Sequence, residues 1–248
     1  VMAVAHKYSA KHFKPEYTGI AMTKDIENDL KKEGLQHTTL IPHALKLDPD
    51  TLRAEISYHT IPIIGAMGRF VEDKGFRYYL EALAILRNEG FAFQAVLGGQ
   101  GPLKKELEKL ARNRGLQDHV HFPGWIENKK HFFEDIDIFC IPSIHEPFGI
   151  VVLEGMQTQV PMVVANSEGP SEILTPQHDA IVVEKGNPSS LAQGLKKLLI
   201  DQELAQKLVD NAYKTLQTRY SFDLISLVLK EAIEETLHRH FTKKSVSI

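Results

Sequence analysis

Two carboxylates with seven residues between them form the most distinctive pattern in this 248-residue sequence. A proline and a glycine lie between Glu146 and Glu154 and mark a loop that leads into a helix. The backbone N–H groups of Phe148, Gly149 and Ile150 would then be free at the positive end of that helix. Helical side chains tilt toward the N-terminus, so Glu154 would point back to the same place. The pattern suits a polyhydroxylated ligand that carries phosphate, although Glu154 could instead simply favour the helix dipole.

Two cations and a glycine-rich run provide further partners for such a ligand. Arg69 and Lys74 flank one predicted strand–helix turn and could neutralise a diphosphate, or be a solvated surface pair. Gly98, Gly99 and Gly101 come before a predicted helix. They could let the backbone approach a bulky ligand, or form a tight turn. Their spacing does not match the G-x-G-x-x-G fingerprint of dinucleotide-binding proteins.

Short β-rich runs alternate with amphipathic helices over most of the chain, which predicts an α/β fold with a parallel, doubly wound sheet. The predicted strands are 61–66, 94–97, 120–122, 136–141, 162–165 and 180–183. The predicted helices are 75–89, one from 102, 149–157, and the chain from 188 onward.

Four unusual segments follow directly after predicted strands: 68–75, 98–102, 124–126 and 143–154. Ligands of open α/β sheets bind outside the carboxyl ends of the strands. We therefore expect all four segments to meet in one crevice.

The beginning of the chain repeats the same alternation on a smaller scale, with strands at 18–22 and 38–41 around a helix at 24–33. Residues 42–58 lack clear periodicity. These features predict a small unit over 1–46, a linker or hinge over 47–58, a large Rossmann-like domain over 59–220 and helices over 221–248. The chain starts abruptly without an initiator Met, so we expect the beginning of a longer protein to be missing.

Composition excludes several classes of protein. A net charge of −3 and a pI of about 6.5 give no basis for nucleic-acid binding. The single cysteine, Cys140, excludes a disulfide scaffold and a structural zinc site, and it fits a reducing compartment. The sequence shows no signal peptide and no apolar run of membrane-spanning length. We therefore expect a cytoplasmic protein.

The segments together resemble the donor domain of glycosyltransferase family 4. The motifs that carry the resemblance are G-R-F-x-x-x-K-G at 68–75, G-G-x-G-P at 98–102, F-x-G-W at 122–125, P-S-x-x-E-P-F-G-I-x-x-L-E at 142–154 and S-E-G-P-S-E-I-L at 167–174. The resemblance covers about residues 19–240. It implies the GT-B fold, with 59–220 as the donor domain, 1–46 as the end of the acceptor domain and 221–248 crossing back to it.

The resemblance also implies roles for particular residues. Arg69 and Lys74 would hold the donor diphosphate, and Glu146 would bind hydroxyls of the transferred sugar together with nearby backbone amides. Glu154 would bind the ribose hydroxyls, and the backbone around Ile126 would lie near the base. The remaining donor-binding residues are then Gly98, Gly99, Gly101, Phe148, Gly149 and Ile150.

Two matches near the beginning of the chain concern the acceptor side. Val4-Ala5-His6-Lys7 resembles the strand end that carries an acceptor-domain histidine in related mannosyltransferases, so His6 is a second catalytic candidate beside Glu146. It could equally be a structural histidine. Ile41-Pro42-His43-Ala44 departs from the Pro-Asn-Gly that is common in the family, and it puts the hinge contact there in doubt.

The function implied is a retaining, metal-independent transfer of sugar without a cofactor. The donor would be a UDP- or GDP-type nucleotide sugar, and the acceptor a glycan or a lipid-linked molecule. We expect a role in lipopolysaccharide or other envelope polysaccharide synthesis, with peripheral association at the inner face of the membrane through the acceptor domain.

Other readings remain open at this point. The chain could be a nucleotide-sugar-binding module without catalysis, or a GT-B epimerase. A phosphorylase would need a pyridoxal lysine motif, which we do not identify. Asp135-Ile136-Asp137 has the D-x-D form of metal-dependent sugar transferases, but it begins a strand at the end opposite the crevice. We therefore predict no metal site.

Overall fold

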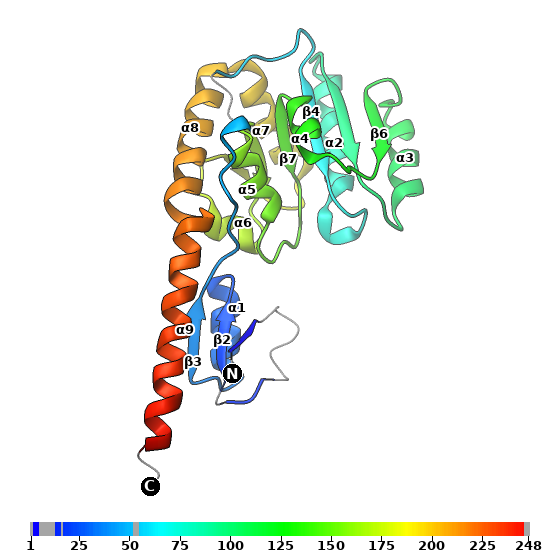
Figure 1. Ribbon diagram of the computed structural model, residues 1–248. Helices are drawn as coiled ribbons and strands as arrows, with labels where there is room; N and C mark the ends of the chain where they lie inside the picture. The colour runs from blue at the N-terminus through cyan, green and yellow to red at the C-terminus, as the bar shows by residue number, and fades with distance from the viewer. Residues whose placement is uncertain (1, 5–12, 16, 52–54, 246–248) are drawn as a thin grey trace. The chain divides into compact units, whose positions relative to one another are not determined.

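The computed structural model describes residues 2–4, 13–15, 17–51 and 55–245, so His6 lies outside the described residues. The chain divides into two units: a larger one over 48–215, and a smaller one that combines 1–47 with 216–248. Figure 1 shows the elements of both. The boundary between residues 215 and 216 falls inside helix α8 (Gln202–Arg219), a few residues before the predicted boundary at 220.

Part of the predicted hinge is packed against the larger unit. The backbone N–H of Ile56 donates to the Gln206 side chain at 2.8 Å, and the Tyr58 hydroxyl donates to the Leu198 carbonyl at 3.0 Å. Both side chains also pack against the main apolar core. This stretch is therefore an integral part of the larger unit and does not act as a free linker.

A six-stranded parallel sheet forms the centre of the larger unit, in the order β6-β5-β4-β7-β8-β9. This confirms the predicted doubly wound α/β fold. The chain adds β5 and β6 on one side of β4, then returns to add β7, β8 and β9 on the other side. The strands are β4 (Ile63–Met67), β5 (Gln94–Gly98), β6 (Val120–Gly124), β7 (Ile138–Ile141), β8 (Met162–Ala165) and β9 (Ile181–Val183).

Helices follow the strands in the larger unit. They are η3 (Glu72–Lys74), α2 (Phe76–Asn88), α3 (Lys104–Asn113), α4 (Lys129–Glu134), α5 (Ile150–Gln157), α6 (Glu168–Ile173) and α7 (Pro188–Ile200), and a 3-10 turn η2 (Pro49–Thr51) lies near the start. The sequence did not predict η2, η3, α4 or α6, because elements of three to six residues are too short to show a period.

The sheet is covered on both faces, which explains why its strands read as continuous apolar runs. Buried side chains of α2, α3 and α7 form the main core with one face; α7 packs so closely that Gly194 lies against Val163 and Val183. On the other face, Phe132 and Phe133 of α4 make edge contacts with Phe139 of β7. Figure 1 shows α4 and α5 on the near side of the sheet and α7 behind it.

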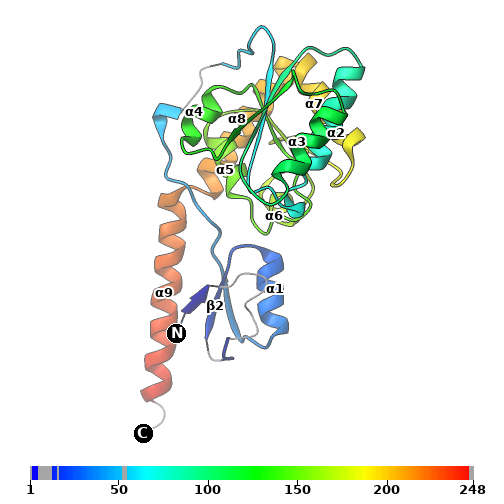
Figure 2. The same ribbon diagram turned by 90° about the vertical axis from the view of Figure 1, so that its right-hand side faces the viewer.

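The smaller unit contains a three-stranded parallel sheet in the order β1-β2-β3. Its elements are β1 (Met2–Val4), β2 (Thr18–Ala21), α1 (Lys24–Lys32), β3 (His37–Leu40) and α9 (Phe222–Ser245). Thr23 caps α1 by accepting a hydrogen bond from the Ile26 N–H at 3.3 Å. Ala232 of α9 packs in a small core with Ile20 and Ile41, so the last helix belongs to this sheet (Figure 2).

Within the parts of the chain that the structure describes, none of the helices combines the length and the apolar character that crossing a membrane requires.

Candidate functional site

The four motif segments of the larger unit all begin at the carboxyl ends of parallel strands, as the sequence predicted. They follow β4, β5, β6 and β7. The first and last of them flank the point between β4 and β7 where the strand order reverses, which is where ligands of such sheets bind. The first three loops are tied together by hydrogen bonds from the Gly68 N–H to the Gly98 carbonyl at 3.0 Å and from the Gly99 N–H to the Gly124 carbonyl at 2.6 Å.

A pocket of about 220 Å³ opens among these loops. Among the described residues that line it, Arg69 and Lys129 carry charge, and Trp125, Ile126 and Val151 supply apolar walls. The other lining residues are Met67, Gly68, Gly98 and Gly99. The pocket therefore brings together four predicted site residues, namely Arg69, Gly98, Gly99 and Ile126, and combines cations with a flat apolar surface.

The glycine-rich run makes room for neighbouring protein as well as for the pocket. Gly99 has a φ of +145°, and a Cβ there would lie 1.9 Å from the Gly68 carbonyl oxygen. Gly101 faces the backbone of Phe70, 2.5 Å from where its Cβ would be, and does not line the pocket. A glycine is required at these positions because two loop backbones touch there.

Lys74 and Glu146 form an ion pair with 2.5 Å between Lys74 Nζ and Glu146 Oε2. Both side chains are largely shielded from solvent, with 28% and 11% of their surface exposed. The pair joins the loop after β4 to the loop after β7. The backbone N–H groups of Ile144 and His145 also donate to the Asp73 carbonyl, at 2.8 and 3.1 Å. The predicted phosphate-binding lysine and the predicted sugar-binding carboxylate therefore contact each other.

Gly75 makes this junction possible. Its φ of +64° lies in the left-handed region, and a Cβ there would lie 2.1 Å from the carbonyl oxygen of Pro142. The turn that carries Lys74 can therefore lie directly against the end of β7.

Glu154 is the fifth residue of α5, one turn after Val151 of the pocket wall, and so on the same face of the helix. Its Oε1 accepts from Lys129 Nζ at 2.6 Å. Its Oε2 is buried and has no hydrogen-bond partner among the described residues. A buried carboxylate oxygen in this state is costly unless something donates to it.

The loop between the two carboxylates turns sharply before α5. Gly149 has a φ of +97° and accepts a hydrogen bond from the Val152 N–H at 2.9 Å. Phe148 is 5% exposed, and Gly169 packs against its backbone. Ile150 is 41% exposed. The loop therefore turns its aromatic side chain inward.

Glu168 holds the Glu146 loop from the other side. Its Oε1 lies 3.1 Å from the His145 ring and 3.5 Å from Lys185 Nζ, and its Oε2 accepts from the Glu146 N–H at 3.4 Å. Burial alone would raise the pKa of Glu168, but hydrogen bonds from its own backbone, His145 and Glu146, with the charge of Lys185, lower that pKa to about 2. The carboxylate is therefore ionised at any physiological pH.

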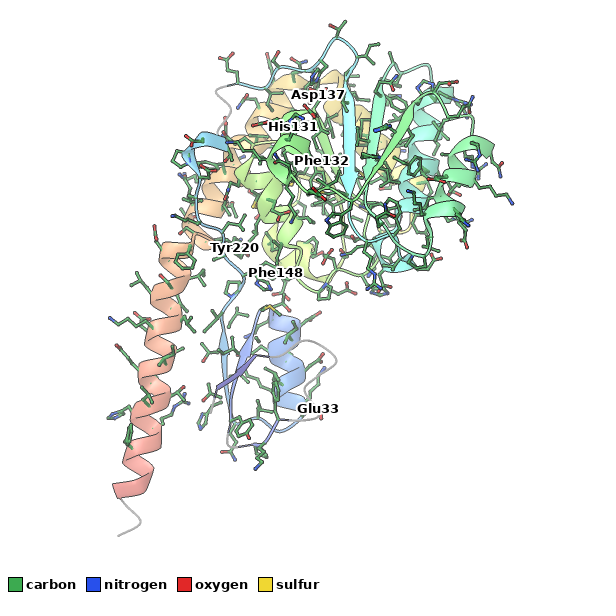
Figure 3. The ribbon with its side chains drawn as sticks, turned by 45° about the vertical axis from the view of Figure 1, so that its right-hand side comes forward. Glu33, His131, Phe132, Asp137, Phe148 and Tyr220 are labelled. Carbon is green, nitrogen blue, oxygen red and sulfur yellow. The ribbon has the colours of Figure 1, made fainter. Side chains whose placement is uncertain are left out.

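Asp137 of the D-x-D sequence has structural hydrogen-bond partners, and it lies at the end of the sheet opposite the pocket. Figure 3 shows Asp137 at one end of the larger unit and Phe148 at the other. The Asp137 carboxylate accepts from the His59 N–H at 3.1 Å and from the Ile63 N–H at 2.6 Å, and it is buried. These hydrogen bonds hold in place the chain segment that leads into β4.

A second hollow of about 240 Å³ lies between α2 and α3. Its arginines, Arg77 and Arg114, both pair with Glu81. It contains none of the residues predicted to bind ligand.

Sequence reasoning missed Lys129, His145 and Glu168. Lys129 follows the F-x-G-W motif by four positions and begins a helix that was not predicted. Glu168 belongs to the motif at 167–174, to which the resemblance assigns no role. A search for polar and charged residues within seven positions after every predicted strand would have found all three.

Solved structures with the same fold define the class. A glycosyltransferase from Rickettsia africae matches with a TM-score of 0.81 at 20% identity, over 95% of this chain and 70% of that one. Anabaena HepE, crystallised with UDP and glucose, matches with a TM-score of 0.77 at 20% identity, over 91% of this chain and 65% of that one. The fold is that of GT-B glycosyltransferases.

The sequence places the chain in a particular family. Residues 49–215 match the model of the glycosyl transferases group 1, and the chain belongs to this family. A lipopolysaccharide core biosynthesis glycosyltransferase of Rhizobium meliloti, LpsD, is 36% identical over 159 residues, which are 64% of this chain and 45% of the relative. The chain spans about half the length of LpsD and of LpsE, a second lipopolysaccharide core biosynthesis glycosyltransferase of the same organism.

Proposed function

We propose that this chain binds a nucleoside diphosphate sugar at the switch point of its larger unit and that the protein transfers the sugar with retention. The observation that carries the proposal is the pocket at the ends of β4, β5 and β6, with Arg69 in its wall and the Lys74–Glu146 pair on the neighbouring loops. Membership in the glycosyl transferases group 1 supports the activity.

Each part of the donor has a chemically suitable partner. Trp125, which is 64% exposed, and Ile126 offer an apolar wall to the base. Arg69 and Lys74 would face the diphosphate, and Glu146 the sugar hydroxyls. Glu154 would accept hydrogen bonds from the ribose.

The cations would support transfer without a metal. When the bond between the anomeric carbon and the diphosphate oxygen breaks, the electron pair and the negative charge go to the diphosphate. Arg69 and Lys74 would stabilise this charge as it develops. Lys74 would also hold Glu146 in place for the sugar. We propose no cofactor.

The finer assignments rest on the motif resemblance and on relatives. We propose that the protein belongs to glycosyltransferase family 4 and acts at the cytoplasmic face of the envelope, on a glycan or lipid-linked acceptor. The similarity to a lipopolysaccharide core glycosyltransferase supports this pathway. His6 is proposed as a residue of the acceptor side.

Calorimetric titration with UDP-, GDP- and ADP-sugars tests donor binding. Arg69→Ala should weaken binding about tenfold or more, because it removes a charge-assisted contact. Arg77→Ala is the matched control, since Arg77 is exposed and pairs with Glu81 outside the pocket. Failure of all three donors to bind, or equal losses in both variants, would refute the proposed site.

A product assay on the full-length protein separates transfer from binding. Glu146→Ala should lower turnover more than nucleotide affinity, because its proposed partner is the sugar. NMR of the new anomeric centre tests retention. Donor binding without transferred sugar would favour the alternative of a binding module without catalysis.

A further inference from the structure

We infer that the ring of His145 binds a hydroxyl of the transferred sugar, with its Nε2 atom accepting the hydrogen bond and Glu168 holding the ring in place. The inference rests on the proposed function, in which Glu146 faces that sugar. It adds a residue at an unspecified position of the motif at 142–154. It also makes a claim about selectivity, because only a sugar with a free hydroxyl at the position facing His145 would gain this contact.

The strand order places His145 and Glu168 just beyond the part of the site that would hold the diphosphate. The pocket lies at the ends of β4, β5 and β6, and the Lys74–Glu146 pair joins the loops after β4 and β7. His145 directly precedes Glu146, and Glu168 follows β8, the next strand of the sheet. A donor with its base in the pocket and its diphosphate at the switch point would therefore carry its sugar toward these two side chains.

One carboxylate fixes both the ring of His145 and the backbone of Glu146. Glu168 Oε1 lies 3.1 Å from His145 Nδ1, and Glu168 Oε2 accepts a hydrogen bond from the Glu146 N–H at 3.4 Å. The backbone N–H of His145 also donates to the Asp73 carbonyl at 3.1 Å. The ring therefore has a defined position relative to Glu146, which a residue that selects among sugar hydroxyls requires.

The contact with Glu168 decides which ring nitrogen of His145 carries the proton. The carboxylate is ionised at physiological pH and can only accept, so Nδ1 must donate to it. A neutral ring then has no proton on Nε2, which is left as an acceptor. Nε2 has no hydrogen-bond partner among the described residues, and 58% of the side chain is exposed. Such an atom suits a hydroxyl group, which can donate a hydrogen bond.

A second histidine has the same local chemistry at the other end of the sheet. His178 Nδ1 lies 2.9 Å from Asp179 Oδ1, and 57% of the His178 side chain is exposed. His178 comes just before β9, at the amino ends of the strands, whereas His145 follows β7 at the carboxyl ends. His178 therefore lies away from the proposed donor, and it provides the matched control.

Asparagine variants separate contact with the sugar from the structural role of the ring. The amide nitrogen of asparagine can take the position of Nδ1 and keep the contact with the carboxylate, but asparagine has no atom at the position of Nε2. Calorimetry is run on the natural protein, His145→Asn and His178→Asn at about pH 8, where histidine rings are mostly neutral. The probes are UDP-glucose, GDP-mannose and ADP-glucose, and then the free nucleoside diphosphate of the one that binds most tightly.

The readout is the ratio of the dissociation constant of the free nucleotide to that of the nucleotide sugar, which cancels a general loss of affinity. His145→Asn should lower this ratio about fivefold, the effect of one hydrogen bond, and His178→Asn should leave it unchanged. Circular dichroism confirms that each variant is folded.

Monodeoxy and deoxyfluoro forms of the sugar then identify the hydroxyl. At one position, both forms should bind the natural protein about fivefold more weakly than the parent, because neither hydrogen on carbon nor fluorine can donate. Both forms should bind His145→Asn as well as the parent does, because the partner of the hydroxyl is already missing there.

Each contrary result has a distinct meaning. If His145→Asn keeps the ratio of the natural protein, or if His178→Asn lowers it equally, the inference is overturned, while binding of the nucleotide sugar leaves the proposed function standing. If the deoxyfluoro form binds as well as the parent at the position that depends on His145, Nε2 is not the acceptor and the inference is wrong. If no nucleotide or nucleotide sugar binds, the proposed function itself fails.

Discussion

The two units of the chain differ in how much of their apolar surface they bury. The bulkiest fully buried side chains among the described residues belong to the larger unit, except for Leu30. The smaller unit centres on Ile20, Ile41 and Ala232, and several large apolar side chains of its helix α9 are exposed. The unit that carries the pocket thus has a rigid, two-sided scaffold, whereas the smaller unit has little stability to spare.

The largest expected effect comes from removing one buried leucine from each unit. Leu30→Ala and Leu83→Ala both truncate a fully buried side chain and should cost about 2–5 kcal/mol each. In the smaller unit this should abolish the fold, and in the larger unit it should lower the midpoint of chemical denaturation. Hydrogen exchange followed by mass spectrometry distinguishes the units. Equal loss of protection in both units after Leu30→Ala would mean that they unfold together.

The next largest effect is the difference in stability cost between alanine substitutions at two glycines with positive φ. Gly75→Ala would bring a Cβ within 2.1 Å of the Pro142 carbonyl oxygen, whereas at Gly34, with a φ of +91°, nothing lies within 4 Å. Gly34→Ala should cost about 1 kcal/mol for the left-handed conformation alone. Gly75→Ala should cost more and should also weaken nucleotide binding, because the turn that carries Lys74 must move. Thermal denaturation and calorimetry measure both, and similar costs would contradict the packing argument.

A smaller expected effect is on the pH dependence of stability, and one carboxylate in each unit should show it. Hydrogen bonds from Lys24 and Lys31, opposed by burial and helped by Thr38, lower the pKa of Glu27 from 4.5 to about 2. Glu168 in the larger unit shows the same change, from 4.5 to about 2. A lowered pKa stabilises the folded state above pH 4.5, and this contribution disappears as the pH falls toward 2.

Glu27→Gln and Glu168→Gln should therefore each lower stability at neutral pH, and the difference from the natural protein should shrink between pH 4.5 and 2. Denaturation curves over this pH range measure it. Glu33→Gln, at an exposed position after α1, serves as the control. A loss that stayed constant down to pH 2 would exclude these ionised carboxylates as its cause.

The smallest effect concerns the exposed face of α9. Leu227 is 59% exposed, so Leu227→Ala should change the stability of the isolated chain by less than about 0.5 kcal/mol. A urea titration measures it. A loss comparable to that of Leu30→Ala would show that Leu227 is covered in solution.

Much of the fold could be predicted from periodicity. The strand Met162–Ala165 is a continuous apolar run between turn residues, and its bounds agree with the predicted ones. The edges of other elements shifted by one or two residues; β7, for example, begins at Ile138 and not at the predicted Ile136. Helix α4, with six residues, carries too little of a period to be recognised.

The site was predicted in part for the same reason. Strand ends place Arg69, Ile126 and Glu146 at one edge of the sheet, but strand order decides which of them touch. The Lys74–Glu146 pair exists because β4 and β7 are neighbours, a fact that no local pattern contains. The Lys129–Glu154 pair likewise depends on how α4 and α5 pack on one face.

The pairing of β4 with β7 also bears on the order of events during folding. Lys74 and Glu146 are 72 positions apart, and the strands β5 and β6 lie between them in the chain. Contacts of such long range form late, because a long loop must close before they yield any free energy. As the chain leaves the ribosome, β4, β5 and β6 can assemble with Arg69 before β7 is available. Nascent chains that end before β7 would therefore carry Arg69 and Lys74 at the ends of their strands without Glu146, the ion-pair partner of Lys74.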